Sequence, residues 1–247
     1  MTREYLAKRF PRASLQEREH IVNDWLGKEE QAEGIARDFE VRAMPLADKR
    51  ILDAGSGNGG ISIALAKHGA SVEGVDIEED LIDIARTVNA SDRVHFTCYD
   101  GTTLPFADRS FDGAISVSVL EHVSDPARFL SEIARVTKPG GLLYLALPNR
   151  LYPRETHTQL WGLSYLPRPL AQLYARVAGR SPLEDQNLHF YTYFGVLRLA
   201  RVAGWKLRNE EGKTTHGLKY FAKRLLRALG IPHQALLPHV MLILEAS

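Results

Sequence analysis

The sequence predicts an α/β fold built on a doubly wound, mostly parallel sheet, and three observations support this prediction. First, a short apolar run, residues 50–54, leads into a glycine-rich turn, residues 55–60, and then into a helical pattern. Second, a further apolar run ends in Asp76, 76 − 55 = 21 positions after the first glycine. Third, apolar runs continue to alternate with helical patterns as far as residue 147. This alternation is typical of parallel sheets, which bind nucleotide-like cofactors at the carboxyl ends of their strands.

The glycine-rich turn matches two cofactor-binding patterns. Gly55, Gly57 and Gly60 satisfy the dinucleotide fingerprint G-x-G-x-x-G. With Gly59 in place of Gly60, the same turn satisfies G-x-G-x-G. Asp53, two residues before the first glycine, favours the second pattern. The alternative is a glycine-rich turn that binds no ligand.

The acid that ends the second apolar run is a candidate ligand for a ribose. Asp76 stands close to the roughly 20 positions after the first glycine at which a ribose-binding carboxylate is expected. Its charge would strengthen hydrogen bonds from both ribose hydroxyls. The alternative is an N-cap for the helical segment that begins near Glu78, and the two roles are compatible.

Three further elements follow the ribose-binding candidate. A third apolar run, residues 93–99, ends at Asp100-Gly101-Thr102, which could also be a plain turn. Residues 126–136 predict a helix with one apolar face. Pro139-Gly140-Gly141 should end that helix before a strand at residues 142–147.

These segments carry a resemblance to a known family. Leu52-Asp53-Ala54-Gly55-Ser56-Gly57 resembles the first motif of class I methyltransferases that use S-adenosylmethionine. Residues 119–123 and 125–141 are similar to the ubiquinone-biosynthesis O-methyltransferases and related small-molecule enzymes. The resemblance covers about residues 50–150. It implies a seven-stranded sheet whose last strand is antiparallel.

The resemblance also implies how the chain is organised. A single methyltransferase domain over residues 1–247 would contain four parts. They are an N-terminal helical cap at 1–45, a cofactor-binding core at 46–148, a helical lid insertion after the fifth strand at 149–190, and a C-terminal part at 191–247. Loops on a rigid scaffold often determine which ligand binds, so the aromatic-rich insertion is expected to cover the acceptor, with an oligomer contact as its alternative.

Under this resemblance the cofactor is S-adenosyl-L-methionine, and each part of it has expected contacts. The methionine end would meet Asp53, Gly55, Ser56 and Gly57, and the ribose Asp76 and Ile77. The adenine would meet Asp100, Gly101 and Thr102, and the amino group the backbone of Val117.

Three histidines are candidates for the base that removes a proton from an acceptor hydroxyl. His122 follows the fourth strand, and imidazole titrates near neutral pH. His157 and His189 lie in the insertion and at its end. The alternative for His122 is a histidine that is retained for packing.

The ubiquinone-pathway relatives bind a divalent metal through a Glu-x-x-Glu-His pattern. The corresponding residues here are 118–122, where Ser118 replaces the first glutamate. Hard divalent ions prefer oxygen ligands, so the loss of one carboxylate predicts that no metal is required.

Net charge, cysteine content and the length of the apolar runs limit the classes of protein to which this chain can belong. A net charge of +1 does not favour a nucleic-acid partner, and the lone Cys98 excludes an internal disulfide. No apolar run is long enough to span a bilayer, which predicts a cytoplasmic enzyme. Residues 216–230 form a basic amphipathic pattern that suits either an anionic membrane surface or an ordinary surface helix. The sequence does not predict an oligomeric state.

The resulting hypothesis is methyl transfer to oxygen on a small or lipid-like acceptor. Three alternatives remain open at this point. They are an N- or C-methyltransferase on a small metabolite, a nicotinamide-dependent oxidoreductase, and a non-catalytic binding module with the same fold.

Overall fold

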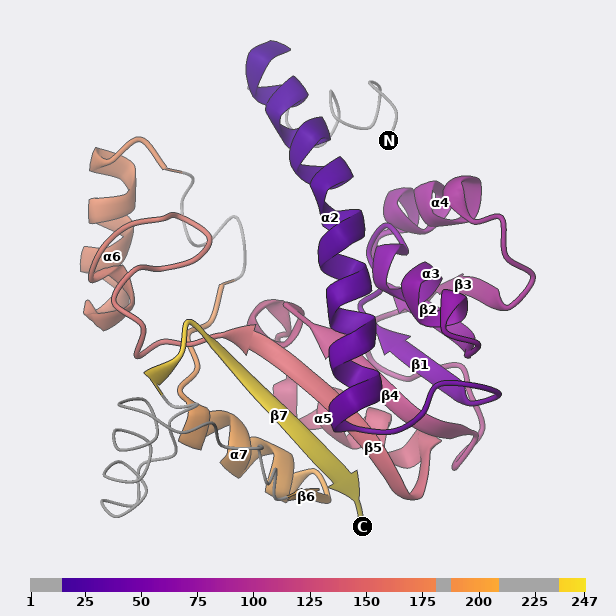
Figure 1. Ribbon diagram of the computed structural model, residues 1–247. Coiled ribbons are helices and arrows are strands. Elements are labelled where there is room, and N and C mark those ends of the chain that lie inside the picture. The colour runs from indigo at the N-terminus through magenta and orange to yellow at the C-terminus, as the bar shows by residue number, and fades with distance from the viewer. Residues whose placement is uncertain (1–14, 181–187, 209–235) are drawn as a thin grey trace, which may run out of the picture. The chain divides into compact units, whose positions relative to one another are not determined.

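The computed structural model describes residues 15–180, 188–208 and 236–247, with side chains from residue 29 onward (Figure 1). Seven strands form one sheet in the order β3-β2-β1-β4-β5-β7-β6. The strands are β1 (Arg50–Ala54), β2 (Ser71–Asp76), β3 (Val94–Cys98), β4 (Phe111–Val117), β5 (Thr137–Pro148), β6 (Trp205–Leu207) and β7 (His239–Ala246). β1 pairs in parallel with β2 and β4, whereas β6 and β7 pair antiparallel. The predicted fold class is therefore confirmed.

Helices connect these strands. They are α2 (Leu15–Arg42), α3 (Gly60–Lys67), α4 (Glu79–Val88), α5 (Pro126–Val136), α6 (Arg168–Val177) and α7 (Tyr193–Val202), with short 3-10 turns η1 (Leu120–His122) and η2 (Leu163–Tyr165). None of the helices in the described ranges is long and apolar enough to cross a membrane. The predicted basic segment 216–230 lies outside the described residues.

The chain forms two compact units. The first consists of the residues up to 115 together with 136–142, and the second of 116–135 together with 143–247. Strand β1 illustrates the core of the first unit, because Ile51, Leu52 and Ala54 are fully buried. Burial on both faces of a strand is typical of the centre of a parallel sheet.

Helix α5 and strand β6 show how the second unit is packed. Leu130 and Ile133 of α5 are fully buried, as the predicted apolar face requires. Trp205 of β6 is also buried, and its Nε1 donates to the carbonyl oxygen of Leu130 at 3.0 Å. Because the buried indole N–H cannot reach water, this hydrogen bond satisfies it.

The start of β5 differs from the prediction. We expected residues 139–141 to form a turn before a strand at 142–147, but β5 begins at Thr137, directly after α5. Lys138 Nζ lies 2.7 Å from Asp112 Oδ1. A Cβ on Gly141 would lie 2.8 Å from the main-chain oxygen of Asp112, so the backbones are closely apposed here. The glycine thus permits close strand contact rather than a turn.

The predicted helical insertion after the fifth strand is present. It contains η2 and α6. Its two ends lie side by side, because Asn149 and Tyr191 form a parallel bridge. A second bridge joins Arg154 to Trp161. The insertion has a small core of its own, formed by Leu163, Ala171, Ala175 and Leu188.

Candidate functional site

The glycine-rich turn joins β1 to α3 within the first unit. Gly55, Gly57 and Gly59 all have positive φ angles of 88°, 53° and 83°, whereas Gly60 is the first residue of α3. A Cβ on Gly59 would lie 2.5 Å from Phe96 Cζ, and a Cβ on Gly57 would contact nothing within 4 Å. The backbone therefore requires glycine in the G-x-G-x-G pattern. Gly57 thus combines this requirement with open space, whereas Gly59 does not.

Asp76 holds this turn in place from the end of β2. Its Oδ2 accepts a hydrogen bond from the Gly57 amide at 2.9 Å, and its Oδ1 accepts from the Glu78 amide at 3.0 Å. Glu78 itself precedes α4, so Asp76 orders the turn before that helix rather than being its N-cap residue. The predicted glycine turn and the predicted ribose ligand are thus brought into direct contact.

Asp53 occupies a different environment although it is nearby in sequence. Its side chain is buried, and its Oδ2 accepts a hydrogen bond from Ser62 Oγ of α3 at 2.6 Å. Burial raises the pKa of Asp53 to about 7, and the neighbouring charge of Asp76 acts in the same direction. This carboxyl therefore connects β1 to α3.

The end of β3 brings together four of the predicted adenine and ribose residues. Asp100 Oδ1 accepts hydrogen bonds from the amides of Thr102 and Thr103 at 2.8 and 3.0 Å, which is a turn. Gly101 lies against Ile77, because a Cβ on this glycine would be 3.1 Å from Ile77 Cγ2. Ile77 is 63% exposed, which leaves an apolar surface available at this strand end.

Two observations test whether these residues fit S-adenosylmethionine. The Ser56 hydroxyl is buried and has no hydrogen-bond partner within the described residues, so a ligand could satisfy it. The space beside Gly57 would allow a ligand to approach the main chain. The residues present are therefore compatible with the cofactor.

The end of β4 lies in the second unit. Val117 is its last residue, and Ser118 adopts a left-handed conformation with φ of 56°. The Ser118 amide donates to the carbonyl oxygen of Ala146 at 2.8 Å. The left-handed conformation is uncommon for residues other than glycine, and such backbone strain is frequently found at functional sites.

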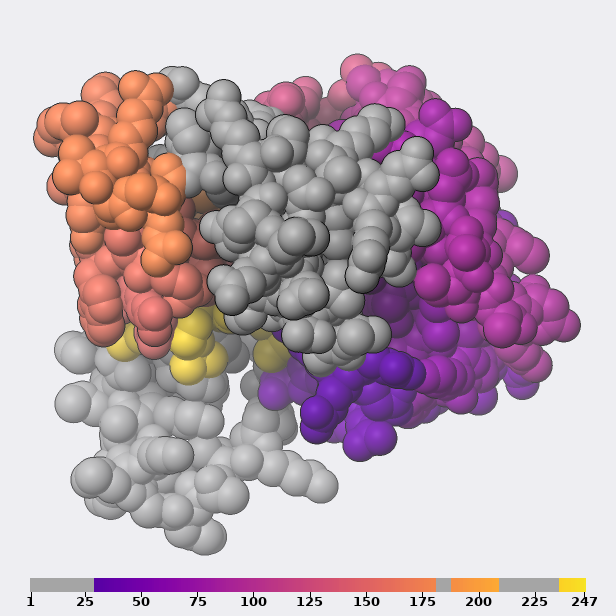
Figure 2. Space-filling model, turned by 90° about the horizontal axis from the view of Figure 1, so that it is seen from above, coloured from indigo at the N-terminus to yellow at the C-terminus, as the bar shows by residue number. Residues whose placement is uncertain are grey.

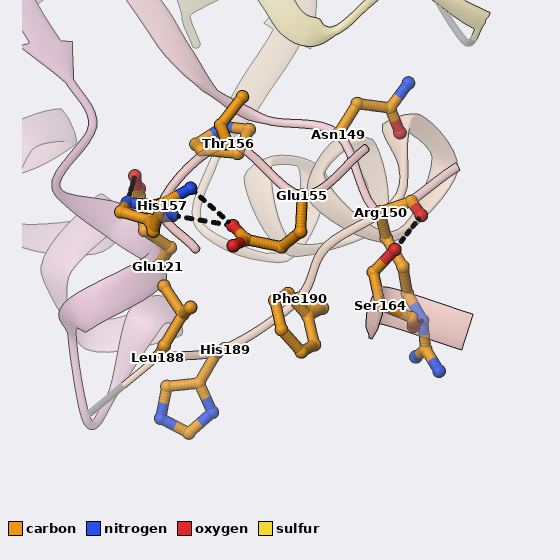
Figure 3. Close-up of a pocket in the computed structure, with 11 residues that line it drawn as sticks. Glu121, Asn149, Arg150, Glu155, Thr156, His157, Ser164, Leu188, His189 and Phe190 are labelled. Carbon is orange, nitrogen blue, oxygen red and sulfur yellow. Dashed lines mark hydrogen bonds and ion pairs between the residues drawn. The ribbon is translucent and has the colours of Figure 1, made fainter. Parts of the chain in front are cut away.

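Directly after this strand end, Glu121 and His157 form the centre of a polar cluster (Figure 3). Glu121 is 1% exposed, and neither of its carboxylate oxygens accepts a hydrogen bond within the described residues. His157 Nε2 lies 3.8 Å from Glu121 Oε1. Burial raises the pKa of Glu121 to about 7. A buried carboxyl without a donor is costly, so this group is a candidate for ligand contact.

Glu155 orients His157 from the insertion. Its Oε1 lies 2.9 Å from His157 Nδ1, and its Oε2 accepts from the amide and hydroxyl of Thr158. Because the carboxylate accepts from Nδ1, the proton lies on Nδ1 and the lone pair on Nε2. Burial alone would lower the pKa of His157, but the hydrogen bond to Glu155 raises it above its ordinary value.

The other two predicted histidines lie on either side of this pair. The rings of His122 and His157 meet edge to face at 5.4 Å between centroids. The His189 amide donates to the Glu121 carbonyl oxygen, but its ring points away from the Glu155–His157 pair (Figure 3). The structure thus brings His122 and His157 together and directs His189 elsewhere.

A small cavity adjoins the cluster. Glu121, Glu155 and His157 line one side of it, and His189 and Phe190 also contribute. Its volume is about 10 Å³, which is room for about one water-sized group. A single hydroxyl group would fit there, but a whole acceptor molecule would not.

The donors present differ from the hard-metal pattern of the ubiquinone-pathway relatives. Glu121, His122 and His157 offer one carboxylate oxygen and two imidazole nitrogens, all within 4.8 Å of one another. Imidazole suits softer transition metals, whereas magnesium prefers oxygen. Among these three residues only Glu121 offers a carboxylate, so the group does not match the oxygen ligands that magnesium prefers.

Sequence reasoning did not single out Glu155. The signal that could have found it is an acid two residues before a candidate histidine, in the segment Glu155-Thr156-His157-Thr158. Such spacing allows a carboxylate to bond both the ring and the backbone of the histidine, as it does here.

Comparisons with known proteins show which family of domains the chain resembles. Residues 52–145 match the methyltransferase domain family. The chain is 39% identical over 125 residues to a ubiquinone biosynthesis O-methyltransferase of Coxiella burnetii, covering 50% of this chain and 53% of that protein. It is 31% identical over 177 residues to the Xanthomonas oryzae enzyme of the same name, covering 70% and 66%.

The chain thus spans about half the length of the first of these curated relatives. Among solved structures, an S-adenosylmethionine dependent methyltransferase from Mesorhizobium loti aligns with a TM-score of 0.58 at 22% identity, covering 87% of this chain and 97% of that one. This similarity supports the fold.

Proposed function

We propose that this chain, whose residues 52–145 belong to the methyltransferase domain family of the class I, S-adenosylmethionine-dependent kind, transfers a methyl group to an oxygen of a small or lipid-like acceptor. The observation that carries the proposal is the contact between Asp76 and Gly57 within the matched segment. A carboxylate and a glycine with open space beside it, at the same strand edge, suit a ligand that combines a ribose with a charged tail.

Each part of the cofactor would have its own contacts. Ser56 and Gly57 would hold the methionine end, with Asp53 and Gly55 shaping the turn beneath it. Asp76 would accept from the ribose hydroxyls. The remaining proposed contacts are Ile77 to the ribose, Asp100, Gly101 and Thr102 to the adenine, and the Val117 backbone to the amino group. Bound S-adenosylmethionine would supply an electrophilic methyl group on its sulfonium.

His157 is the preferred base among the three candidate histidines. Glu155 fixes the imidazole tautomer so that Nε2 can accept a proton. Glu121 lies 3.8 Å away and would stabilise the imidazolium that forms. An acceptor hydroxyl in the adjacent cavity would donate its proton to Nε2, and its oxygen would take the methyl group.

The preference for oxygen and for a lipid-like acceptor depends on the relatives. Both of the curated relatives named above are ubiquinone biosynthesis O-methyltransferases. A base beside a cavity for one hydroxyl group suits O-methylation, because a hydroxyl must lose its proton whereas a neutral amine is already nucleophilic.

Calorimetry with S-adenosylmethionine and with NAD tests this proposal. Binding of S-adenosylmethionine alone is the expected result. Binding of NAD alone would instead identify an oxidoreductase, and binding of neither would identify a non-catalytic module. A methyl-transfer screen over phenols, amines and lipid-linked quinols then identifies the accepting atom.

A further inference from the structure

The cavity beside Glu121 and His157 is also lined by a buried hydroxyl group. Thr156 stands between Glu155 and His157 in the chain and lines the cavity (Figure 3). Its Oγ1 is buried and has no hydrogen-bond partner within the described residues. Four buried side-chain atoms share this property there, and three of them are this oxygen and the two carboxylate oxygens of Glu121. Unpartnered buried polar atoms are rare in folded proteins, so their presence around one cavity points to a ligand.

The segment around Thr156 is otherwise well hydrogen-bonded. Glu155 accepts from the amides of His157 and Thr158 at 2.9 and 2.6 Å. The Gln159 side chain donates to the Thr156 carbonyl oxygen. The neighbouring Thr158 hydroxyl donates to Glu155 Oε2 at 2.7 Å, so this threonine supports the segment in a way that Thr156 does not. An ordered backbone therefore holds the Thr156 side chain at the cavity.

The distances around the cavity suit a single oxygen atom. His157 Nε2 lies 3.8 Å from Glu121 Oε1, which is too far for a hydrogen bond, but one oxygen between them could contact both. The cavity volume of about 10 Å³ also corresponds to one such group. The His157 side chain is 25% exposed and that of Glu121 is 2% exposed, so the histidine is the side that solvent reaches. The insertion that carries His157 lies at the surface of the molecule, where Figure 2 shows it in salmon and orange.

A hydroxyl group matches the donors and acceptors of this cavity better than an amine does. The Thr156 hydroxyl can donate a hydrogen bond, and the lone pair of His157 Nε2 can accept one. A hydroxyl oxygen has two lone pairs, so it can accept from Thr156, donate to His157 and still keep a lone pair for the methyl group. A neutral amine has a single lone pair, and a hydrogen bond from Thr156 would occupy it.

We propose that Thr156 is a specificity-determining residue, whose hydroxyl donates a hydrogen bond to an alcohol or phenol hydroxyl bound between His157 and Glu121. Its role in turnover rests on the proposed function. In that reaction the O–H bond of the acceptor breaks as its proton passes to His157 Nε2. A lone pair of the oxygen forms the bond to the methyl carbon, and the electron pair of the broken C–S bond stays on the sulfur. Thr156 stabilises the negative charge that develops on the oxygen during this step.

Binding of 4-fluorophenol and of fluorobenzene to the full chain tests this site, because the two probes differ only in the hydroxyl group. Fluorine NMR titration without cofactor should show tighter binding of 4-fluorophenol. Thr156→Val should reduce this preference about tenfold, because the site loses its donor. Thr156→Ser retains the hydroxyl and should retain the preference.

Melting temperatures distinguish a binding role of Thr156 from a structural one. Thr156→Val removes a buried hydroxyl that has no partner among the described residues, so the variant should melt at the same temperature as the parent or higher. Thr158→Val is the matched control from the same segment. It removes a hydroxyl that bonds Glu155, so this variant should melt at a lower temperature.

Methyl transfer to 4-fluorophenol measures the role of Thr156 in turnover. Thr156→Val should lower kcat/KM about 10- to 100-fold, mostly through kcat, because the negative charge on the oxygen develops only in the transition state. Absence of methyl transfer by the parent, together with an intact preference for 4-fluorophenol, would count against the proposed function and support the hydroxyl site.

Four results would overturn the proposal. They are equal binding of the two probes by the parent, an unchanged preference in Thr156→Val, a preference lost as fully in Thr156→Ser, and a Thr156→Val protein that melts as low as Thr158→Val. A crystal structure with 4-fluorophenol that shows an ordered water in the cavity and the phenol elsewhere would overturn it as well.

Discussion

Two buried carboxyls, one in each compact unit, show that burial alone does not make a carboxyl group available to a ligand. Asp53 and Glu121 are both 1% exposed, and burial raises the pKa of each to about 7. Asp53 accepts a hydrogen bond from Ser62, whereas Glu121 has no hydrogen-bond donor among the described residues. The first carboxyl joins a strand to a helix. The second lies beside a histidine and a cavity, and its unsatisfied oxygens are what a reacting group could use.

The largest expected effect is on turnover and concerns the histidine next to Glu121. His157→Ala should lower the turnover number about 10²- to 10⁴-fold, because it removes the proposed general base. Glu155→Gln should lower it less, since the ring remains but loses its charged partner. Steady-state kinetics of His157→Ala, His122→Ala and His189→Ala measure this, with the exposed His95→Ala as control. Unchanged turnover in all three variants would rule out a histidine base.

The next largest effect is on the affinity for the proposed cofactor. Asp76→Ala should weaken S-adenosylmethionine binding by about 100-fold, because charge-assisted hydrogen bonds to two hydroxyls are lost. Calorimetry measures the affinity, and a thermal melt verifies that the glycine turn still folds. Glu79→Ala removes a nearby exposed carboxylate and should bind as the parent does. Equal affinity in Asp76→Ala would move the pocket elsewhere.

Asp53→Asn should stabilise the protein at alkaline pH. The folded pKa of Asp53 is raised from 3.8 to about 7, so its contribution to folding is greatest in acid and decreases as the pH rises through that interval. Asparagine keeps an acceptor for Ser62 without the charge. We expect a gain of about 2 kcal/mol in unfolding free energy at about pH 8 and much less at about pH 5. Urea denaturation at both pH values measures these gains, and equal gains would contradict the prediction.

A smaller effect of opposite sign is expected at His68. Its ring lies 2.8 Å from Glu33 and 3.0 Å from Glu40, and the hydrogen bond to Glu33 raises the pKa of His68 above 6.5. A raised histidine pKa stabilises the fold in acid, and that contribution is lost as the pH rises through the folded value. His68→Gln should therefore cost about 1 kcal/mol or less near pH 6 and nothing near pH 9, as measured by urea denaturation.

No effect is expected from removing divalent ions. Because Ser118 replaces a carboxylate of the divalent-metal pattern, a chelator should leave methyl transfer unchanged. Activity that disappears with the chelator and returns with magnesium would contradict this.

The sequence predicted the glycine turn and the acid at the end of the next strand because these signals are local. A glycine turn between a strand and a helix requires positive φ at fixed positions, and an acid at the end of the next parallel strand must lie at the same sheet edge. Asp76 and Gly57 meet for these reasons. Asp53 already favoured Gly59 over Gly60, whereas the close contact of Gly59 with the distant Phe96 needed the structure.

The insertion could not be predicted in the same way. Glu155 and Glu121 are 34 positions apart (155 − 121), and no motif links them, so only the folded insertion places His157 between them. Helix α6 shows the same limit. Its buried face is formed by the small Ala171 and Ala175, which no motif in the sequence marks.

Phe96 has a consequence for how homologous sequences should vary. A side chain on Gly59 or on Gly74 would meet the same ring, at 2.5 and 2.6 Å. These three positions should therefore coevolve, with larger residues at 59 or 74 accompanied by a smaller one at 96. Position 57 should show no such covariation, because its positive φ of 53° favours glycine while a Cβ there would meet nothing within 4 Å.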